Sequence, residues 1–401
     1  MDRLVNTVRP YAWGSTTAIP ELLGQQPTGE PQAELWMGAH PGAPSRIDRG
    51  DGERSLAEVI AADPKTELGA AVLERFGPSL PFLFKVLAAG RALSVQVHPT
   101  LEQARAGFAD EEARGVPLDA PYRNYKDANH KPEMICALSD FDGLCGFRAP
   151  AATADLLASL GVPALAPWIA VLRTAPEQEA LRTVLAEMLS ADREPTAVLV
   201  GNVTRALAEA AAADGPYAAT CAACASAARD YPGDPGILAA LLLNHVRLRP
   251  GQALHLGAGM PHAYLGGLGV ELMANSDNVL RCGLTCKHVD VPELLRVVDF
   301  RAAEPAVLSP QPLPAAEDEQ AYPVPVEEFR LSRLTLRGAG RTVDGRAPQI
   351  LLCTAGEAVL TDAAGGTLTL APGSSAYLPA DGTDVRVTGA DAVVFRATVC
   401  C

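Results

Sequence analysis

The feature that most constrains the fold is a change in sequence character that occurs twice along the chain. From residue 1 to about 150, short apolar runs broken by glycine and proline, such as residues 81–87 and 93–98, are typical of β-strands. From residue 151 to 244, alanine and leucine dominate, and apolar residues recur at helical spacing. Strand character resumes at His245. The sequence therefore predicts a mainly β protein that carries one helical insert.

The C-terminal part divides into two segments. Residues 303–328 are rich in proline, and we expect a linker or surface crossing without regular structure there. From residue 329 to 401, alternating apolar positions are separated by glycine turns, which predicts a small antiparallel barrel or jelly roll. The predicted domains are therefore residues 1–150 together with 245–302, a helical insert over 151–244, a linker over 303–328 and a C-terminal barrel over 329–401.

Two Pro-Gly turns suggest an internal duplication. One lies at residues 250–251 and the other at residues 372–373, and each precedes an apolar strand that ends in another proline. The second copy has no histidine where the first has His262. We therefore expect two related β-barrel units, of which one holds a metal and the other serves structure.

Charge and hydropathy argue against two classes of partner. The formal net charge of −14 disfavours nucleic acid, because binding a phosphate backbone needs a broad basic surface. A small phosphorylated ligand held by a local cationic cluster remains compatible with this charge. The longest apolar stretches, such as residues 237–243, fall far short of the roughly 20 residues that cross a bilayer. Polar residues interrupt the N-terminal segment where a secretory signal would lie, so we expect a cytoplasmic protein without membrane partners.

The cysteines point to the same compartment. There are nine, odd in number and without a regular framework, which suits reduced thiols. Cys221 and Cys224 have a spacing found in redox and zinc sites, but they lie in an alanine-rich helical stretch. We interpret these two, and also Cys282 and Cys286, as packing residues.

A metal site is the chemistry that the polar residues favour. Gln96 and His98 are two apart on a predicted strand, so their side chains leave the same face. Glu133 ends a dense polar run, and His262 follows a glycine-containing loop. Imidazole and carboxylate suit zinc and its neighbours, although glutamine is an uncommon ligand. Spacing alone does not select His98 and His262 above His255, and polar residues on a half-exposed strand are the plainer alternative.

Two long motifs carry a resemblance to a known family. Residues 125–133 read Y-x-D-x-N-H-K-P-E, and residues 262–287 form a second block that begins with His262 and ends with Lys287. Together with residues 11–15, 34–41, 84–87 and 93–99, they resemble the type I phosphomannose isomerases over about residues 9 to 300. The departures, Cys282 and Cys286, remove no charged or ligating group.

The resemblance implies a fold, a metal and a reaction. The fold is a pair of cupin-type β-barrels with an inserted α-helical domain, the first barrel being catalytic. The metal is one zinc ion per chain, held by Gln96, His98, Glu133 and His262. The reaction interconverts mannose 6-phosphate and fructose 6-phosphate through an enediol, which needs a base and an electrophile. The partner is therefore a small hexose phosphate, and we expect a monomer.

Further residues of the matched blocks receive expected roles. Arg281 is expected to face the enediolate oxygens or the phosphate, because a guanidinium offers a rigid charged fork. Lys131 and Glu271 are the two candidates for proton transfer, and Glu271 is alternatively a residue that orients a metal ligand. The substrate-binding residues implied by the resemblance are Ser94, Lys85 and Lys287 for the phosphate and His130, Asp277 and Tyr264 for the pocket.

Two rival functions have to be weighed against this one. The first is a binding module that holds a sugar or a metal without turnover, because one fold hosts many functions. The joint presence of Glu133, Lys131 and Arg281 disfavours it. The second is an iron oxygenase of the same barrel class, whose sites use two histidines and one carboxylate with open positions. Gln96 as a fourth protein ligand disfavours that function.

Overall fold

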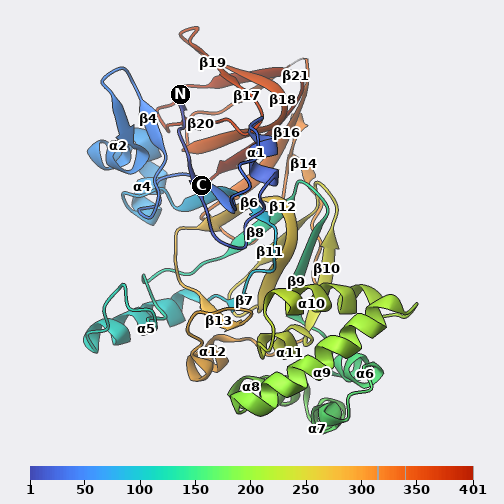
Figure 1. Cartoon of the computed structure of the whole chain (residues 1–401). Helices are drawn as coiled ribbons and strands as arrows, with labels where there is room; N and C mark the ends of the chain where they lie inside the picture. Colours follow the sequence, from blue (N-terminus) through green and yellow to red (C-terminus); the bar gives the residue numbers. More distant parts are fainter. Residues whose placement is uncertain (314–315, 339, 401) are drawn as a thin grey trace.

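Most strands of the protein belong to two antiparallel sheets. The structure is a computed structural model that describes residues 1–313, 316–338 and 340–400. One sheet has ten strands, the other has nine, and the hairpin of β4 (Arg46–Asp48) and β5 (Glu53–Ser55) forms a third. In Figure 1 the nine-stranded sheet, orange to red, lies at one end and a group of helices, green to yellow, at the other. No helix among the described residues is long and apolar enough to span a membrane.

The ten-stranded sheet is organised around one long strand, β12 (His262–Ala274), which pairs with four others. The remaining strands are β2 (Thr7–Arg9), β3 (Glu34–Met37), β6 (Phe82–Ala89), β7 (Val95–Val97), β8 (Glu133–Ala137), β9 (Phe141–Phe147), β10 (Leu243–Leu248), β11 (Ala253–Leu256) and β13 (Leu280–Gly283). Along β12, His262 lies opposite Gln96, whereas Met273 lies opposite Glu133. A straight strand would separate these two positions by roughly 36 Å.

The middle of β12 is rich in glycine and allows this strand to bend. The pairing with β9 shifts register between Tyr264 and Gly266, and Gly267 has a φ of 120°, where a side chain would meet the backbone of Asp140. Such irregularities bend a strand and increase its twist. The bend brings the two ends of the strand to one interior, which is where the candidate site lies.

The nine-stranded sheet contains both ends of the chain. Its strands are β1 (Asp2–Arg3), β14 (Gln311–Leu313), β15 (Ala316–Ala321), β16 (Arg330–Arg337), β17 (Arg341–Val343), β18 (Gln349–Asp362), β19 (Thr367–Leu370), β20 (Ser375–Leu378) and β21 (Val385–Thr398). β1 pairs with β20, so the first residues of the chain complete the C-terminal sheet. Apolar side chains such as Leu334, Leu351 and Val394 fill one face of this sheet.

The proline-rich stretch differs from the sequence-based expectation. Residues 303–328 were expected to lack regular structure, yet they contain β14 and β15. Pro312 is compatible with a strand because β14 is the last strand in the sheet order, where a missing N–H is tolerated. Part of this prediction, at residues 314–315, lies outside the described residues.

Consecutive helices separate β9 from β10. They are α6 (Pro150–Ser159), the 3₁₀ helix η1 (Pro163–Leu165), α7 (Ala166–Thr174), α8 (Glu177–Ser190), α9 (Arg193–Ala212), α10 (Ala218–Asp230) and α11 (Gly236–Ala240). β9 and β10 pair with each other, Phe147 opposite Leu243, so the helical segment leaves and re-enters the sheet between neighbouring strands. The other helices are α1 (Ala18–Leu22), α2 (Leu56–Ala62), α3 (Pro64–Leu68), α4 (Ala70–Phe76), α5 (Leu101–Ala113) and α12 (Val291–Val297).

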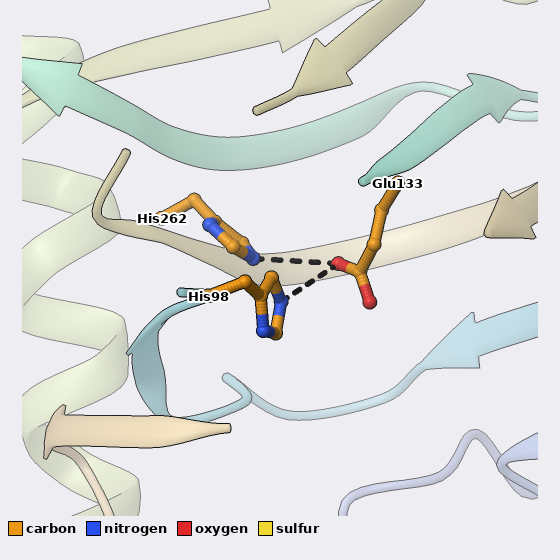
Figure 2. Close-up of side chains that lie close together, drawn as sticks. All are labelled: His98, Glu133 and His262. Carbon is orange, nitrogen blue, oxygen red and sulfur yellow. Dashed lines mark ion pairs between the residues drawn. The ribbon is translucent and has the colours of Figure 1, made fainter. Parts of the chain in front are cut away.

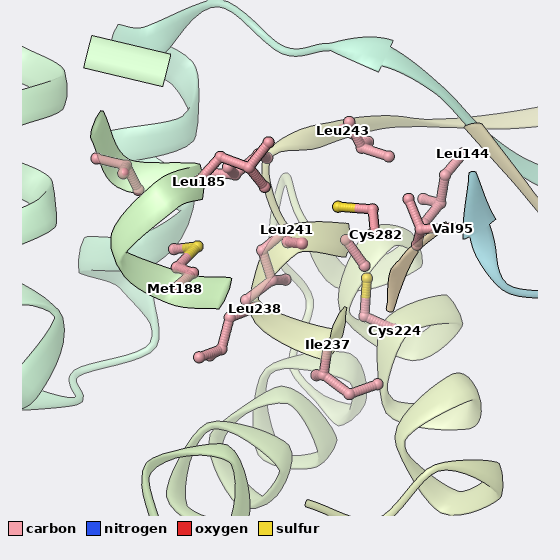
Figure 3. Close-up of a cluster of buried hydrophobic side chains, with 14 of the residues drawn as sticks. Val95, Leu144, Leu185, Met188, Cys224, Ile237, Leu238, Leu241, Leu243 and Cys282 are labelled. Carbon is pink, nitrogen blue, oxygen red and sulfur yellow. The ribbon is translucent and has the colours of Figure 1, made fainter. Parts of the chain in front are cut away.

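A continuous apolar core joins these helices to the ten-stranded sheet. Figure 3 shows Leu185 and Met188 of α8 in the same cluster as Leu144 and Val95 of the sheet. Cys221, Cys224 and Cys282 are buried, unpaired members of this core, which confirms their interpretation as packing residues. Cys286 differs, because it is exposed and lines the cavity described below.

Candidate metal centre and its cavity

Three side chains from separate parts of the sheet converge in the interior. Glu133 begins β8, His262 begins β12, and His98 follows β7 (Figure 2). Oε2 of Glu133 lies 3.3 Å from Nε2 of His98 and 3.5 Å from Nε2 of His262. One atom from each side chain lies within 4.8 Å of the others. All three residues are almost completely buried.

Hydrogen bonds fix which ring nitrogen of each histidine faces the centre. Nδ1 of His98 lies 2.7 Å from the carbonyl of Asn278, and Nδ1 of His262 lies 2.9 Å from the carbonyl of Met260. A carbonyl only accepts, so each Nδ1 donates and each neutral Nε2 carries a lone pair. The two Nε2 atoms and Oε2 of Glu133 are buried and have no hydrogen-bond partner among the described residues. Three acceptors facing one another repel unless a cation lies between them, so the donor set fits a divalent metal.

The electrostatics favour the protonation states that a metal requires. Burial lowers the pKa of His98 to about 4, with Lys131 and His262 acting in the same direction against Glu133, so the imidazole is neutral near pH 7. Burial by itself would raise the pKa of Glu133, but Lys131 and the two imidazoles hold it well below its usual range. A neutral imidazole and an ionised carboxylate are the ligand forms of these groups.

Gln96 and Lys131 lie beside the three acceptors. The backbone of Gln96 is directly opposite both His262 and Arg281 in the sheet register. Nζ of Lys131 lies 2.6 Å from Oε1 of Glu133, which leaves Oε2 turned toward the histidines. Both residues line the cavity that opens from this centre.

A cavity of about 570 Å³ adjoins the three side chains, and Glu133 is the member that lines it. Most of the residues with expected roles line this cavity as well: Lys85, Ser94, Gln96, Lys131, Tyr264, Glu271, Asp277, Arg281 and Lys287. The structure does not bring His130 into its wall. Nε2 of His130 instead lies 2.5 Å from Oε1 of Glu328, in the segment before β16.

Lys85 forms ion pairs with two buried carboxylates. Its ammonium lies 3.0 Å from Oε2 of Glu271 and 3.6 Å from Oε1 of Glu34. Burial raises the pKa of Glu271, whereas Lys85 opposes this rise and Glu133 and Glu34 add to it. The wall near the metal centre therefore holds a carboxyl group whose proton is bound more tightly than usual.

The surroundings of Arg281 and Lys287 differ from those of Lys85. Within the described parts of the chain, neither has a carboxylate at ion-pair distance. Burial lowers the pKa of Arg281, and burial together with Arg281 lowers the pKa of Lys287. Two neighbouring cations without acidic partners are suited to an anionic group of a ligand.

Other wall residues had no expected role. Glu34 and Trp36 lie in a matched stretch, and the indole of Trp36 donates to Glu34 at 2.7 Å. Arg91 follows β6. Asp230 and Tyr231 come from the end of α10, which no sequence signal connects to the sheet.

Comparisons with known proteins agree with the site. A family model of the catalytic domain of type I phosphomannose isomerase matches residues 1–150, and a model of the cupin domain of mannose-6-phosphate isomerase matches residues 318–397. The mannose-6-phosphate isomerase of Escherichia coli (strain K12) is 43% identical over 391 residues, 97% of each chain. Mannose-6-phosphate isomerase 1 of Arabidopsis thaliana is 32% identical over 100% of this chain and 94% of its own length.

Solved structures give the same result. A variant of phosphomannose isomerase from Salmonella typhimurium superposes with a TM-score of 0.91 at 39% identity and 100% coverage of both chains. A zinc-bound mannose 6-phosphate isomerase superposes with a TM-score of 0.89 at 40% identity and 99% coverage of both. The fold and the site thus define a metalloenzyme with a cupin domain. The chain belongs to the type I phosphomannose isomerase family, which confirms the resemblance seen in its motifs.

Proposed function

We propose that this chain is a zinc-dependent aldose-ketose isomerase that interconverts mannose 6-phosphate and fructose 6-phosphate through an enediol. The observation that carries the proposal is the convergence of Nε2 of His98, Nε2 of His262 and Oε2 of Glu133 without hydrogen-bond partners among the described residues. Relatives named mannose-6-phosphate isomerase support the substrate, and a zinc-bound relative supports the metal.

The proposed ligands are Gln96, His98, Glu133 and His262. The first of these is supported by its position opposite His262 and by its place in the cavity wall. When bound, zinc would supply Lewis acidity to the sugar oxygens. The Lys131 ammonium, 2.6 Å from the other oxygen of Glu133, holds that carboxylate in its ionised, ligating form.

Arg281 and Lys287 are the proposed anion-binding groups of the cavity, with Ser94 as a hydroxyl donor. Their lack of acidic partners within the described residues supports this role, since a phosphate dianion supplies the missing charge. Arg281 also lies opposite Gln96, and so its fork is suited to the enediolate oxygens. Lys85 is better suited to orienting Glu271 than to binding phosphate, because two carboxylates already hold its ammonium.

Glu271 and Lys131 remain the two proposed proton carriers between C1 and C2. The raised pKa of Glu271, which burial causes, supports a carboxyl group that holds a proton more readily than an exposed glutamate does. The pH profile of kcat distinguishes them: Glu271→Gln should remove one limb of the profile if this carboxyl group is the base. An unchanged profile in Glu271→Gln, together with a lost limb in Lys131→Met, would assign the base to the lysine.

We also propose how the sheets and helices are divided into domains. The two sheets would be two cupin-type barrels, over residues 1–150 with 245–302 and over residues 329–401, and residues 151–244 would be a helical domain inserted in the first. The cupin match at residues 318–397 supports the second barrel. The chain would act in the cytoplasm, which fits the eight unpaired cysteines among the described residues, and we propose that it is a monomer.

A coupled assay tests the function. Formation of fructose 6-phosphate from mannose 6-phosphate should stop when a chelator removes the metal and should return when zinc is restored. Turnover that persists in the metal-free protein would remove the metal from the reaction. Zinc binding without any turnover would favour the rival binding module.

A further inference from the structure

A turn of the helical segment contacts the loop that carries one of the proposed anion-binding groups. The turn covers residues 231–236, between α10 and α11, and the loop covers residues 284–287, directly after β13, and includes Lys287. A Cβ atom on Gly283 would lie 2.2 Å from Cα of Gly236, so the two backbones meet with no room for a side chain. Side chains of α11 and β13 also lie in one apolar cluster (Figure 3). The helical segment therefore fixes where this loop begins.

Asp234 binds the loop through its backbone. Oδ1 of Asp234 accepts from the backbone N–H of Leu284 at 3.1 Å, and Oδ2 accepts from that of Thr285 at 3.1 Å. Oδ1 also accepts from the N–H of Gly236 at 2.7 Å, which orients the carboxylate within its own turn. Oγ1 of Thr285 in turn accepts from the backbone N–H of Lys287 at 3.1 Å. Two successive hydrogen-bond steps thus lead from Asp234 to Lys287.

The backbone of the loop needs such a restraint. Leu284 has a φ of 55°, a left-handed conformation that leucine rarely adopts, and its side chain is buried in the apolar core. A conformation of this kind persists only where surrounding contacts hold it. The hydrogen bonds from Leu284 and Thr285 to Asp234 are contacts at this place. Loss of the carboxylate should therefore free the loop.

Asp234 acts on the cavity only through this loop. The residues of the loop line the cavity beside the metal centre together with Arg281, whereas Asp234 is not among the described residues that line it. No ion pair joins Asp234 to Arg281 or Lys287 within the described parts of the chain. Because the carboxylate is used on backbone N–H groups, the charges of both cations remain available to a ligand.

We propose that Asp234 is a positioning residue of the isomerase, which holds residues 284–287 so that Lys287 and Arg281 face the same anionic group of the substrate. This role rests on the proposed function, which assigns the two cations to the phosphate. Arg281 and Lys287 act on each other electrostatically, and like charges favour separation, so their convergence needs a restraint. A phosphate held by both cations would depend on Asp234 without touching it.

Steady-state kinetics of the zinc-loaded Asp234→Ala chain test this role. The phosphate is bound alike in the ground state and in the transition state, so KM for mannose 6-phosphate should rise about tenfold while kcat changes by no more than about twofold. A merely structural role would instead lower kcat through a loss of folded protein and leave KM unchanged. Asp234→Asn keeps one acceptor oxygen, so its KM should lie between the two, and it decides the question if Asp234→Ala does not fold.

Asp362→Ala is the matched control. Oδ1 of Asp362 also accepts from two backbone N–H groups, those of Ala364 at 3.0 Å and Gly366 at 2.8 Å, in the turn between β18 and β19 of the other sheet. Its loss should leave KM unchanged. Equilibrium dialysis with labelled inorganic phosphate gives a second measurement, in which Asp234→Ala should bind about tenfold more weakly than the wild type and Asp362→Ala should bind equally well.

Three outcomes would contradict this role. Unchanged KM and unchanged phosphate affinity in both Asp234 variants would overturn it and leave the proposed function intact. An equal rise of KM in Asp362→Ala would do the same, because the effect would then not depend on the loop. A zinc-loaded wild type that neither converts mannose 6-phosphate nor binds phosphate would overturn the proposed function, and the role of Asp234 with it.

Discussion

The two sheets each bury a polar cluster, and the clusters differ in whether they are complete. In the nine-stranded sheet, Oε1 of Glu319 accepts from Arg396 at 2.8 Å and from Ser332 at 2.6 Å, so the protein itself supplies the cation and the donors for this oxygen. In the ten-stranded sheet, His98, His262 and Glu133 present acceptors to one another. A buried polar cluster that satisfies itself contributes to the structure, whereas one that lacks a cation is built to receive it.

The largest expected effect comes from breaking the incomplete cluster. His262→Ala removes one of the three converging acceptors, so bound zinc should fall from one ion per chain to nearly none and turnover should be lost. Elemental analysis after dialysis measures the metal. The control is His255→Ala, because His255 lines another cavity, with Cys145 and Met260, and should leave the zinc in place. A full ion in the His262→Ala protein would contradict the ligand set.

The second-largest effect is expected from replacing Arg281, a cation in the wall of the cavity beside that cluster. Arg281→Ala should lower kcat/KM for mannose 6-phosphate by roughly a thousandfold, because a preorganised positive group facing the substrate is lost. Circular dichroism should show an unchanged fold. Arg281→Lys should recover part of the activity through its charge but not the geometry of the fork. Near-normal kcat/KM in Arg281→Ala would show that the arginine has no such role.

The complete cluster should respond in stability rather than in metal content. Arg396→Met leaves Glu319 buried without its closest cation, so the free energy of unfolding should fall by about 3 kcal/mol. Zinc content should stay at one ion per chain. Arg337→Met, an exposed position on β16, should change stability by no more than about 0.5 kcal/mol. Equal stability of the Arg396→Met and Arg337→Met proteins in urea would argue that the buried pair contributes nothing.

The smallest effect tests a neutral member of the complete cluster. Ser332→Ala removes the hydroxyl that donates to Glu319, which should lower the free energy of unfolding by about 2 kcal/mol and leave turnover unchanged. Because both side chains contact Glu319, the double variant with Arg396→Met should lose less than the sum of the single losses. Strict additivity of the two losses would mean that they act independently.

The sequence-based predictions were confirmed where they rested on motifs of contiguous residues. The motif at residues 125–133 and the block at 262–287 predicted the family, and the Ala-Leu-rich segment predicted the helices within a few residues of α6 and α11. Local spacing could not separate His262 from His255, because they lie on different strands, β12 and β11, and the pairing of these strands with β7 and β8 decides which imidazole reaches Glu133.

The remaining features depend on pairing between distant segments. No local pattern encodes the tertiary contacts behind three further features. They are the addition of β1 to the C-terminal sheet, the strands within the proline-rich stretch and the Glu319–Arg396 pair. Asp230 reaches the cavity wall because α10 ends against the sheet, which its own sequence does not indicate. The expectation for His130 illustrates the same limit, since membership of a matched motif did not reveal its contact with Glu328.

The pairing of β9 with β10 has a consequence for the wall of the cavity. Because the helical segment departs and returns between hydrogen-bonded neighbours, its presence leaves the pairing of β9 with β10 continuous. The same segment supplies Asp230 and Tyr231 to the wall of the cavity beside the metal centre. Changes at the end of α10 would therefore alter the wall of the cavity while leaving His98, Glu133 and His262, which lie outside the helical segment, in place.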